Sequence, residues 1–160
     1  MPVLVKHCAL TFVTVAAMIS SGAAPLRAEN LFDGMRGSWS GAGVVHMSDG
    51  SQERLRCAAS YNPAGANLQM TLRCASDSYK VDLTGHISSD RGKISGNWSE
   101  ASRQLNGELT GIARTGIIQA SATSPTFTAS LTVRTAGRNQ SISIQAPNTP
   151  VSNVAIALKR

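Results

Sequence analysis

A two-residue rhythm of apolar and polar side chains runs through almost every stretch of this chain after residue 36. In residues 79–88, for example, Tyr79, Val81 and Leu83 alternate with Lys80 and Asp82. Successive side chains of a β-strand point to opposite faces, so this period predicts strands with one buried and one exposed face. No stretch beyond residue 28 has the i, i+3, i+4, i+7 apolar spacing of an amphipathic helix. We therefore expect an all-β domain.

Turn-forming residues separate the alternating stretches at short intervals. Short connections imply sequential hairpins, and hence an antiparallel up-and-down meander of about 8–10 strands. Closing such a meander into a small barrel hides its apolar face and removes its edges, and a β-sandwich is the alternative. The expected turns are 49–50, 62–65, 89–92, 115–116, 136–137 and 147–150. The expected strands are 37–47, 51–61, 68–76, 79–88, 93–100, 105–114, 117–123, 126–135, 139–146 and 151–158.

The first 28 residues have the pattern of a secretory signal peptide. A weakly basic start precedes an apolar run over residues 8–19, and small residues follow. The run is short for a permanent membrane anchor, which needs roughly 20 apolar residues. We expect cleavage after Ala28, with Ala23 as the alternative site. This leaves a single domain over residues 29–160 in the periplasm or outside the cell.

The charge of the processed chain is mild. Loss of Lys6 and Arg27 with the leader leaves 13 basic and 9 acidic residues, scattered along the sequence. Nucleic-acid-binding domains instead carry a clustered basic stripe with interleaved aromatic residues, so we expect no nucleic-acid partner. Mild basicity suits solubility, or weak attraction to acidic surfaces of the cell envelope.

Two cysteines, Cys57 and Cys74, remain after the leader, an even number in a chain expected in an oxidising compartment. A disulfide is the natural interpretation, and two free buried thiols are the alternative. If the turn lies at 62–67, Cys57 faces Cys74 across the hairpin, which suits a cross-strand disulfide. The same register places Arg54 opposite Asp77.

The following hairpin has a register that can also be derived from its turn. A turn centred on Asp90 pairs Ile87 with Ile94 and Leu83 with Trp98. All of these side chains then lie on the inner face. A slip of one residue would turn each apolar set outward, so the register is well specified.

The opening of the first strand, Gly37-Ser38-Trp39, resembles the Gly-x-Trp motif of the calycin families, the lipocalins and their relatives. That resemblance implies a barrel whose Trp closes the base beneath a C-terminal basic residue, here Arg134, Arg138 or Arg160. The longer run to Gly43 is similar to the opening of nitrobindins, small haem-binding barrels. Nitrobindins use a histidine late in the chain, and this chain has none after His86, which argues against haem.

The whole processed chain also resembles a group of short exported alphaproteobacterial proteins of unknown function. The segments that carry this resemblance are 72–76 and 96–100. It implies an exported location and no particular activity. For the segment 29–36 the sequence allows two interpretations, a short helix or a turn, and either one would plug one end of the barrel.

Large inward residues are the candidate ligand-binding wall of the barrel. They could equally be core filler, because bulky rings cover bare glycine backbone in sheets, and glycines are expected inward at 41, 43, 85, 96, 107 and 111. The ligand interpretation remains because small inward side chains leave room for one small molecule. The candidates are Trp39, Tyr79, Leu83, Trp98 and Phe127.

Three arginines, Arg54, Arg56 and Arg73, fall on the outer face of the cysteine hairpin. Together they could bind an anionic group or an acidic partner. The alternative is an ordinary solvated face, on which surface ion pairs contribute little.

Catalytic and metal-binding constellations are absent from the pattern of the chain. His46 and His86 fall at outward positions without a partner ligand at motif spacing, and Glu100 and Glu108 do not suggest a convergent pair. We therefore expect no catalytic residues, no metal, no cofactor and no enzymatic activity.

Two functional hypotheses follow from these observations. The first is a calycin-like periplasmic binding module for a small apolar or amphipathic ligand. The second is a non-enzymatic structural or interaction protein of the envelope, with a solid core and an outer face that meets another protein or a glycan. An interior cavity of roughly 300 Å³ or more would favour the first.

Overall fold

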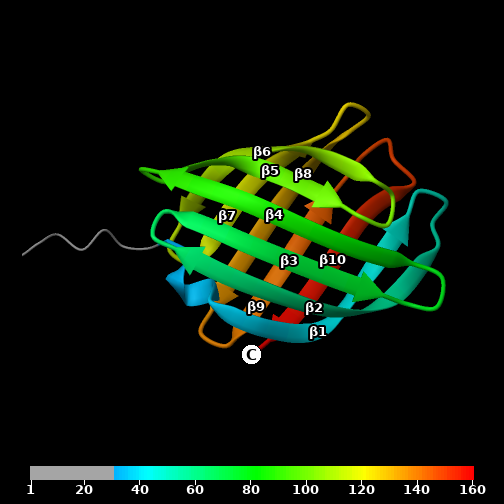
Figure 1. Cartoon of the computed structure of the whole chain (residues 1–160). Helices are drawn as coiled ribbons and strands as arrows, with labels where there is room; N and C mark the ends of the chain where they lie inside the picture. The colour runs from blue at the N-terminus through cyan, green and yellow to red at the C-terminus, as the bar shows by residue number, and fades with distance from the viewer. Residues whose placement is uncertain (1–30) are drawn as a thin grey trace, which may run out of the picture.

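Ten antiparallel strands make up most of the chain that the structure describes, residues 31–160 (Figure 1). In this computed structural model each strand pairs with its neighbours in sequence, and β1 pairs with β10, so that the sheet is a closed barrel. The predicted meander barrel is confirmed, and the sandwich is excluded. The elements are η1 (Asp33–Met35), β1 (Gly37–Met47), β2 (Gln52–Ala64), β3 (Asn67–Ala75), β4 (Lys80–Asp90), β5 (Lys93–Glu100), β6 (Leu105–Arg114), β7 (Ile117–Thr123), β8 (Thr128–Ala136), β9 (Asn139–Gln145) and β10 (Val151–Lys159).

The turn predicted at 62–65 is shorter and lies later in the chain than expected. Strand β2 continues to Ala64, and the turn between β2 and β3 contains only Gly65, at φ +59°, and Ala66. Pro63 is accepted within β2 because it lies beyond the start of β1, where a missing N–H removes no hydrogen bond from the ladder.

The predicted register of the hairpin formed by β4 and β5 is wrong by two residues. Leu83 lies opposite Glu100 instead of Trp98, and Ile87 lies opposite Gly96. The reason is the turn, which contains only Arg91 and Gly92, both with positive φ. Positive φ at both central positions is the geometry of the type I′ turns that two-residue hairpins favour. A shift of two residues leaves every side chain on its predicted face.

The disulfide between Cys57 and Cys74 is confirmed. The two residues lie directly opposite each other in the ladder of β2 and β3, with their Cα atoms 4.1 Å apart. Such a short separation identifies a non-hydrogen-bonded pair, whose side chains are closest. Both cysteines are buried in the barrel interior.

The predicted pair of Arg54 with Asp77 does not form. Strand β3 ends at Ala75, and the turn from β3 to β4 follows immediately. The hydroxyls of Ser76 and Ser78 in this turn donate hydrogen bonds to the carboxylate of Glu53, both at 2.6 Å. These bonds hold the turn, and the ladder of β2 and β3 stops before Arg54.

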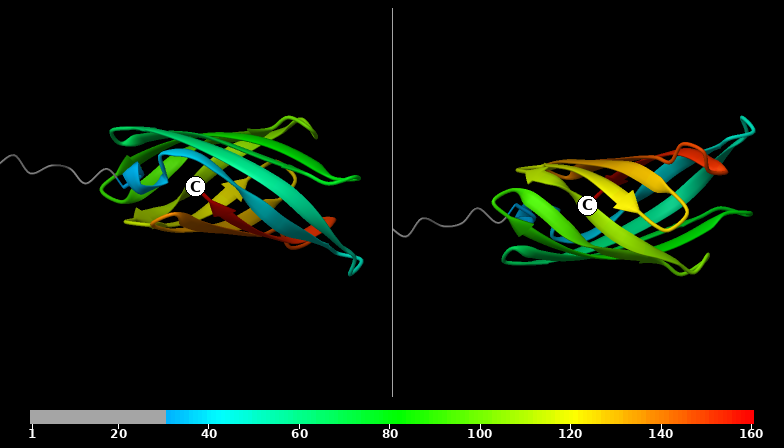
Figure 2. Two further views of the ribbon diagram at one scale, coloured as in Figure 1. Left: turned by 90° about the horizontal axis from the view of Figure 1, so that it is seen from below. Right: turned by 90° about the horizontal axis from the view of Figure 1, so that it is seen from above.

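One end of the barrel, which we term the closed end, is covered by η1 (Figure 2). The side chains of Phe32 and Met35 are buried there, and η1 contacts β2 and β8. The part of the segment 29–36 that the structure describes is therefore a short 3₁₀ helix that plugs the barrel. The expected leader, residues 1–28, lies outside the described residues.

Trp39 completes the closed end. Its indole Nε1 donates a hydrogen bond to the carbonyl oxygen of Met35 at 2.6 Å, and the guanidinium of Arg160 lies 4.8 Å from the ring centroid. Of the three arginines considered from the sequence, Arg160 is the one over the ring, and Arg134 and Arg138 are not. The ring is sandwiched between the core and a cation, an arrangement that stabilises both partners.

Trp98 has a glycine opposite it on each side, Gly85 on β4 and Gly107 on β6. A Cβ at Gly107 would collide with the carbonyl oxygen of Thr123 and touch the Trp98 ring. The large ring therefore covers backbone that carries no side chain, which is the expected aromatic covering of glycine. Within residues 31–160, no helix is long and apolar enough to span a bilayer.

We predict that loss of the disulfide lowers the stability of the barrel. Closing a loop between residues 17 apart contributes about 3 kcal/mol in loop-entropy models. The double variant Cys57→Ala/Cys74→Ala should therefore melt roughly 10 °C below the wild type in a thermal unfolding experiment. Intact-mass analysis of the exported, unreduced protein is the control. Two alkylatable thiols in that sample would contradict the prediction.

Candidate functional site

A cavity of about 390 Å³ occupies the interior of the barrel. Its floor is formed by Met35, Tyr61 and Leu68 at the closed end, and its walls are inward side chains of strands β3 to β10. Almost all of these side chains are aliphatic or aromatic. The interior is thus a hollow, and its surface is apolar.

The cavity opens at the end opposite η1, which we term the mouth. The mouth is formed by the turns at 48–51, 76–79, 101–104, 124–127 and 146–150. Inward side chains near the closed end, such as Ile118 and Ile142, are buried, whereas Leu83, Phe127 and Val154 nearer the mouth are partly exposed. These exposures indicate that solvent reaches the walls formed by β3 to β10 from the mouth, whereas Val45 and Leu55, near the same end of β1 and β2, are fully packed.

Four of the five predicted wall residues lie together at this cavity. Tyr79, Leu83, Trp98 and Phe127 all line it, and the rings of Trp98 and Phe127 are 6.0 Å apart between centroids. The fifth, Trp39, does not line it, because its ring is committed to the closed end under Arg160.

The three predicted arginines do not converge on a site. Arg73 forms an ion pair with Asp82, with 3.2 Å between Nε and Oδ1. Arg54 borders a shallow depression of about 430 Å³ on the outside of the barrel, next to β1 and β10. Arg56 is exposed on the outer face between Ala42 and Ala75.

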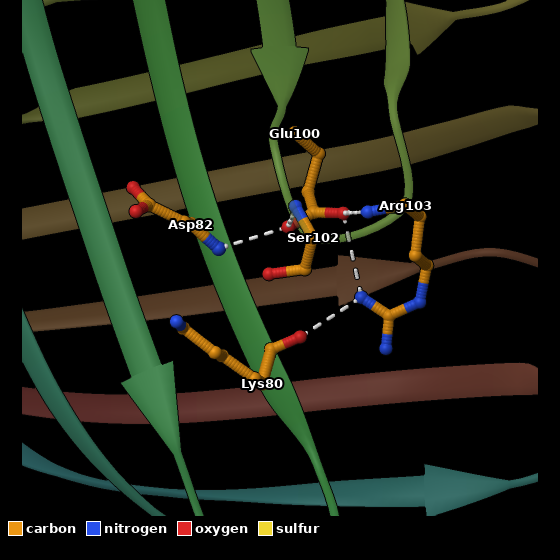
Figure 3. A network of polar contacts seen from close by, with 5 residues as sticks. All are labelled: Lys80, Asp82, Glu100, Ser102 and Arg103. Carbon is orange, nitrogen blue, oxygen red and sulfur yellow. Dashed lines mark hydrogen bonds and ion pairs between the residues drawn. The ribbon is translucent and has the colours of Figure 1, made fainter.

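Among residues 31–160, Glu100 is the acidic residue that lines the cavity, and its side chain is buried. Figure 3 shows its polar contacts. It ends β5 on the inner face, where an unpaired carboxylate would be very costly. Its Oε1 accepts hydrogen bonds from the backbone N–H of Asp82 at 2.9 Å and of Ser102 at 3.0 Å. Its Oε2 accepts one from the N–H of Arg103 at 2.9 Å. The carboxylate thus holds the turn 101–104 and ties it to β4.

The guanidinium of Arg103 lies beside this carboxylate at the mouth. Nη1 donates to the carbonyl oxygen of Lys80 at 3.0 Å and lies 3.5 Å from Oε2 of Glu100. The group also stacks over Tyr79, with 4.4 Å from Cζ to the ring centroid. These contacts fix the position of a cation that borders the cavity.

The ionisation of the mouth residues follows from these contacts. Burial raises the pKa of Glu100, but the backbone N–H groups of Asp82, Ser102 and Arg103 outweigh burial and bring the pKa below its ordinary value. Glu100 is therefore ionised at neutral pH. Burial also raises the pKa of Tyr79, with the Arg103 charge acting in the opposite direction. The Tyr79 hydroxyl therefore stays protonated at neutral pH.

Sequence reasoning missed the pair of Glu100 and Arg103 as a feature of the site. A signal existed for Glu100, because the inward positions of residues 93–100 are Ile94, Gly96 and Trp98, and the same parity places Glu100 inside. No comparable signal existed for Arg103, which lies in a turn and outside any alternation.

Fold and cavity together define a closed, cup-shaped β-barrel, and two solved structures share this fold. The crystal structure of Rv2717c from M. tuberculosis aligns with a TM-score of 0.66 at 16% identity, over 81% of this chain and 94% of that chain. The S-type phycobiliprotein lyase CPES from Guillardia theta aligns with a TM-score of 0.57 at 12% identity, over 82% and 91%. At these identities the similarity concerns the fold alone. No protein-family model and no curated protein matches the chain.

We predict that Glu100 makes the stability of the barrel depend on pH. A group with a lowered folded-state pKa stabilises the fold above its unfolded pKa of about 4.3 and ceases to do so as pH falls through the folded value. The variant Glu100→Gln should be about 2 kcal/mol less stable than the wild type at pH 7, because charge-assisted hydrogen bonds are lost. This difference should shrink on acidification below pH 4.

Denaturant unfolding of both proteins at a series of pH values measures this difference. Glu108→Gln is the matched control, because Glu108 is exposed on the outer face of β6, and this variant should follow the wild type throughout. A gap between wild type and Glu100→Gln that stays constant from pH 7 to pH 3 would refute the role of the carboxylate.

Proposed function

We propose that this protein binds a small, predominantly apolar or amphipathic ligand inside its barrel and acts as a carrier or receptor for it. The observation that carries the proposal is the apolar cavity of about 390 Å³, open at one end. Ligand pockets are typically a few hundred Å³ in volume and lined by apolar and aromatic side chains. The walls here, Tyr79, Leu83, Trp98 and Phe127, have this character.

The alternative, a structural protein with a solid core, is less well supported. It calls for an interior filled to ordinary protein density, at which voids larger than a water molecule are few. The cavity exceeds that size by far. Partly exposed apolar side chains inside a folded domain also cost free energy, and a ligand that covers them returns part of that cost.

The proposed location is the periplasm or the exterior of the cell. A buried disulfide between Cys57 and Cys74 supports an oxidising compartment. The basic start, apolar run and small residues within the sequence of residues 1–28 support export. Similarity in fold to Rv2717c and to a phycobiliprotein lyase is compatible with a ligand-handling barrel, and binding without catalysis remains our proposal for this chain. We likewise keep the relationship to calycins as a proposal, supported by the packing of Arg160 on Trp39.

The proposal is tested by native mass spectrometry of protein purified from its own envelope. We expect the wild type to carry a bound mass that is lost on denaturation. The variant Ala122→Phe, which places a ring in the cavity, should lose this mass and still fold. Ala155→Phe is the matched control, because it makes the same change on the outside of the barrel, in the shallow depression beside β1 and β10 that Arg54 borders. Equal occupancy of both variants, or no bound mass in any sample, would contradict ligand binding in the cavity.

A further inference from the structure

The polar groups that border the cavity are not spread over its surface. They lie at the mouth and near it, in the residues Tyr79, Glu100, Arg103, Thr126 and Thr149. Apart from the hydroxyl of Tyr61, the deeper wall is apolar, and that hydroxyl donates its hydrogen bond to Gln140 at 2.7 Å. A ligand that satisfies both regions has an apolar body directed inward and one polar group at the mouth.

The two charged groups that line the cavity, Glu100 and Arg103, differ in how many of their hydrogen-bonding atoms already have partners within this chain. Both oxygens of Glu100 accept hydrogen bonds from backbone N–H groups, so the carboxylate is fully engaged. The guanidinium of Arg103 uses only Nη1, toward the carbonyl of Lys80 and toward Glu100. Within the described residues, Nε and Nη2 of Arg103 have no hydrogen-bond acceptor.

The free donors form one edge of the guanidinium. The N–H bonds of Nε and Nη2 run parallel along this edge, and their spacing matches the two oxygens of a carboxylate. The stacking over Tyr79 and the bond to Lys80 hold the group in place, so little side-chain entropy is lost when an anion binds.

We propose that the ligand of this barrel is a carboxylate amphiphile, whose apolar body fills the cavity and whose carboxylate pairs with the Nε and Nη2 edge of Arg103. This inference rests on the proposed function, because it assigns a chemical class to the ligand of the same cavity. Arg103 is then the residue that selects an acid over a neutral molecule of the same shape.

Calorimetric titration of the full-length processed protein with decanoate and decanol at pH 7 tests this assignment. The two probes share an apolar chain and differ in the charge of the head group. We expect decanoate to bind the wild type at least tenfold more tightly than decanol. The variant Arg103→Gln should lose roughly tenfold in decanoate affinity and change decanol affinity less than twofold. Arg103→Lys, which keeps the charge and loses the planar edge, should fall between the two.

Arg134→Gln, on the outer face of β8, is the matched control and should leave both affinities unchanged. If Arg103→Gln weakens both probes equally, or neither, Arg103 is only structural and the assignment of an acid is wrong, while the cavity still binds. If neither probe binds the wild type, the proposed function fails with it.

A measurement without variants adds a second criterion: decanoate affinity should fall as ionic strength rises and decanol affinity should not. An identical response of both probes to salt would overturn the assignment.

Discussion

Pairing of β1 with β10 is the interaction on which the rest of the structure depends. It joins the two ends of a ten-strand meander over eight pairs, from Ser40 with Lys159 to Met47 with Val151, with a register shift between His46 and Met47. Without it, two strand edges and one apolar face would be exposed to water. Closure at ten strands also encloses more space than side chains fill, since about eight strands give an interior just wide enough to be filled. The cavity is therefore a consequence of strand number and of small inward residues such as Gly85 and Ala122.

The two ends of the barrel differ in how completely their side chains are packed. At the closed end, Phe32 and Trp39 are almost completely buried, and Trp39 is held by a hydrogen bond and by Arg160. At the mouth, Leu83 and Phe127 remain partly exposed. Inward apolar surface stays partly accessible at the mouth and not at the closed end. A ligand that covers this surface is driven in by the same removal of apolar area from water that folds the barrel.

Most of the fold could be predicted from the alternation of apolar and polar residues. It assigns each strand residue to the inner or outer face, and for that reason the positions of Cys57, Cys74 and Trp98 on the inner face were predictable. It says nothing about a register shift of two residues, because such a shift preserves every face. The pairing of Leu83 with Glu100 was therefore missed. Only the turn decides it, and Arg91 at φ +48° is a residue type that gives little warning of positive φ.

The candidate site was predictable to the extent that it is made of strand residues. Alternation identified Tyr79, Leu83 and Phe127 as inward, but it cannot say which end of a barrel is open. The open end is decided by where η1 packs, and the sequence of η1 has no alternation that could predict its position. For this reason Trp39 was assigned to the ligand wall, whereas the structure places its ring at the closed end.

The polar groups at the mouth depend on one inward strand position that is not apolar. Glu100 stands where the alternation expects an apolar residue, and its charge can remain there only if backbone donors surround it. The turn 101–104 supplies two of the three donors, the N–H groups of Ser102 and Arg103, by folding back over the carboxylate, with Gln104 at φ +56°. The third is the N–H of Asp82 on β4. The same fold of the turn brings Arg103 over Tyr79. A buried acid thus positions a cation at the entrance of an apolar cavity, and the chemistry offered to a ligand there is set by the geometry of the turn.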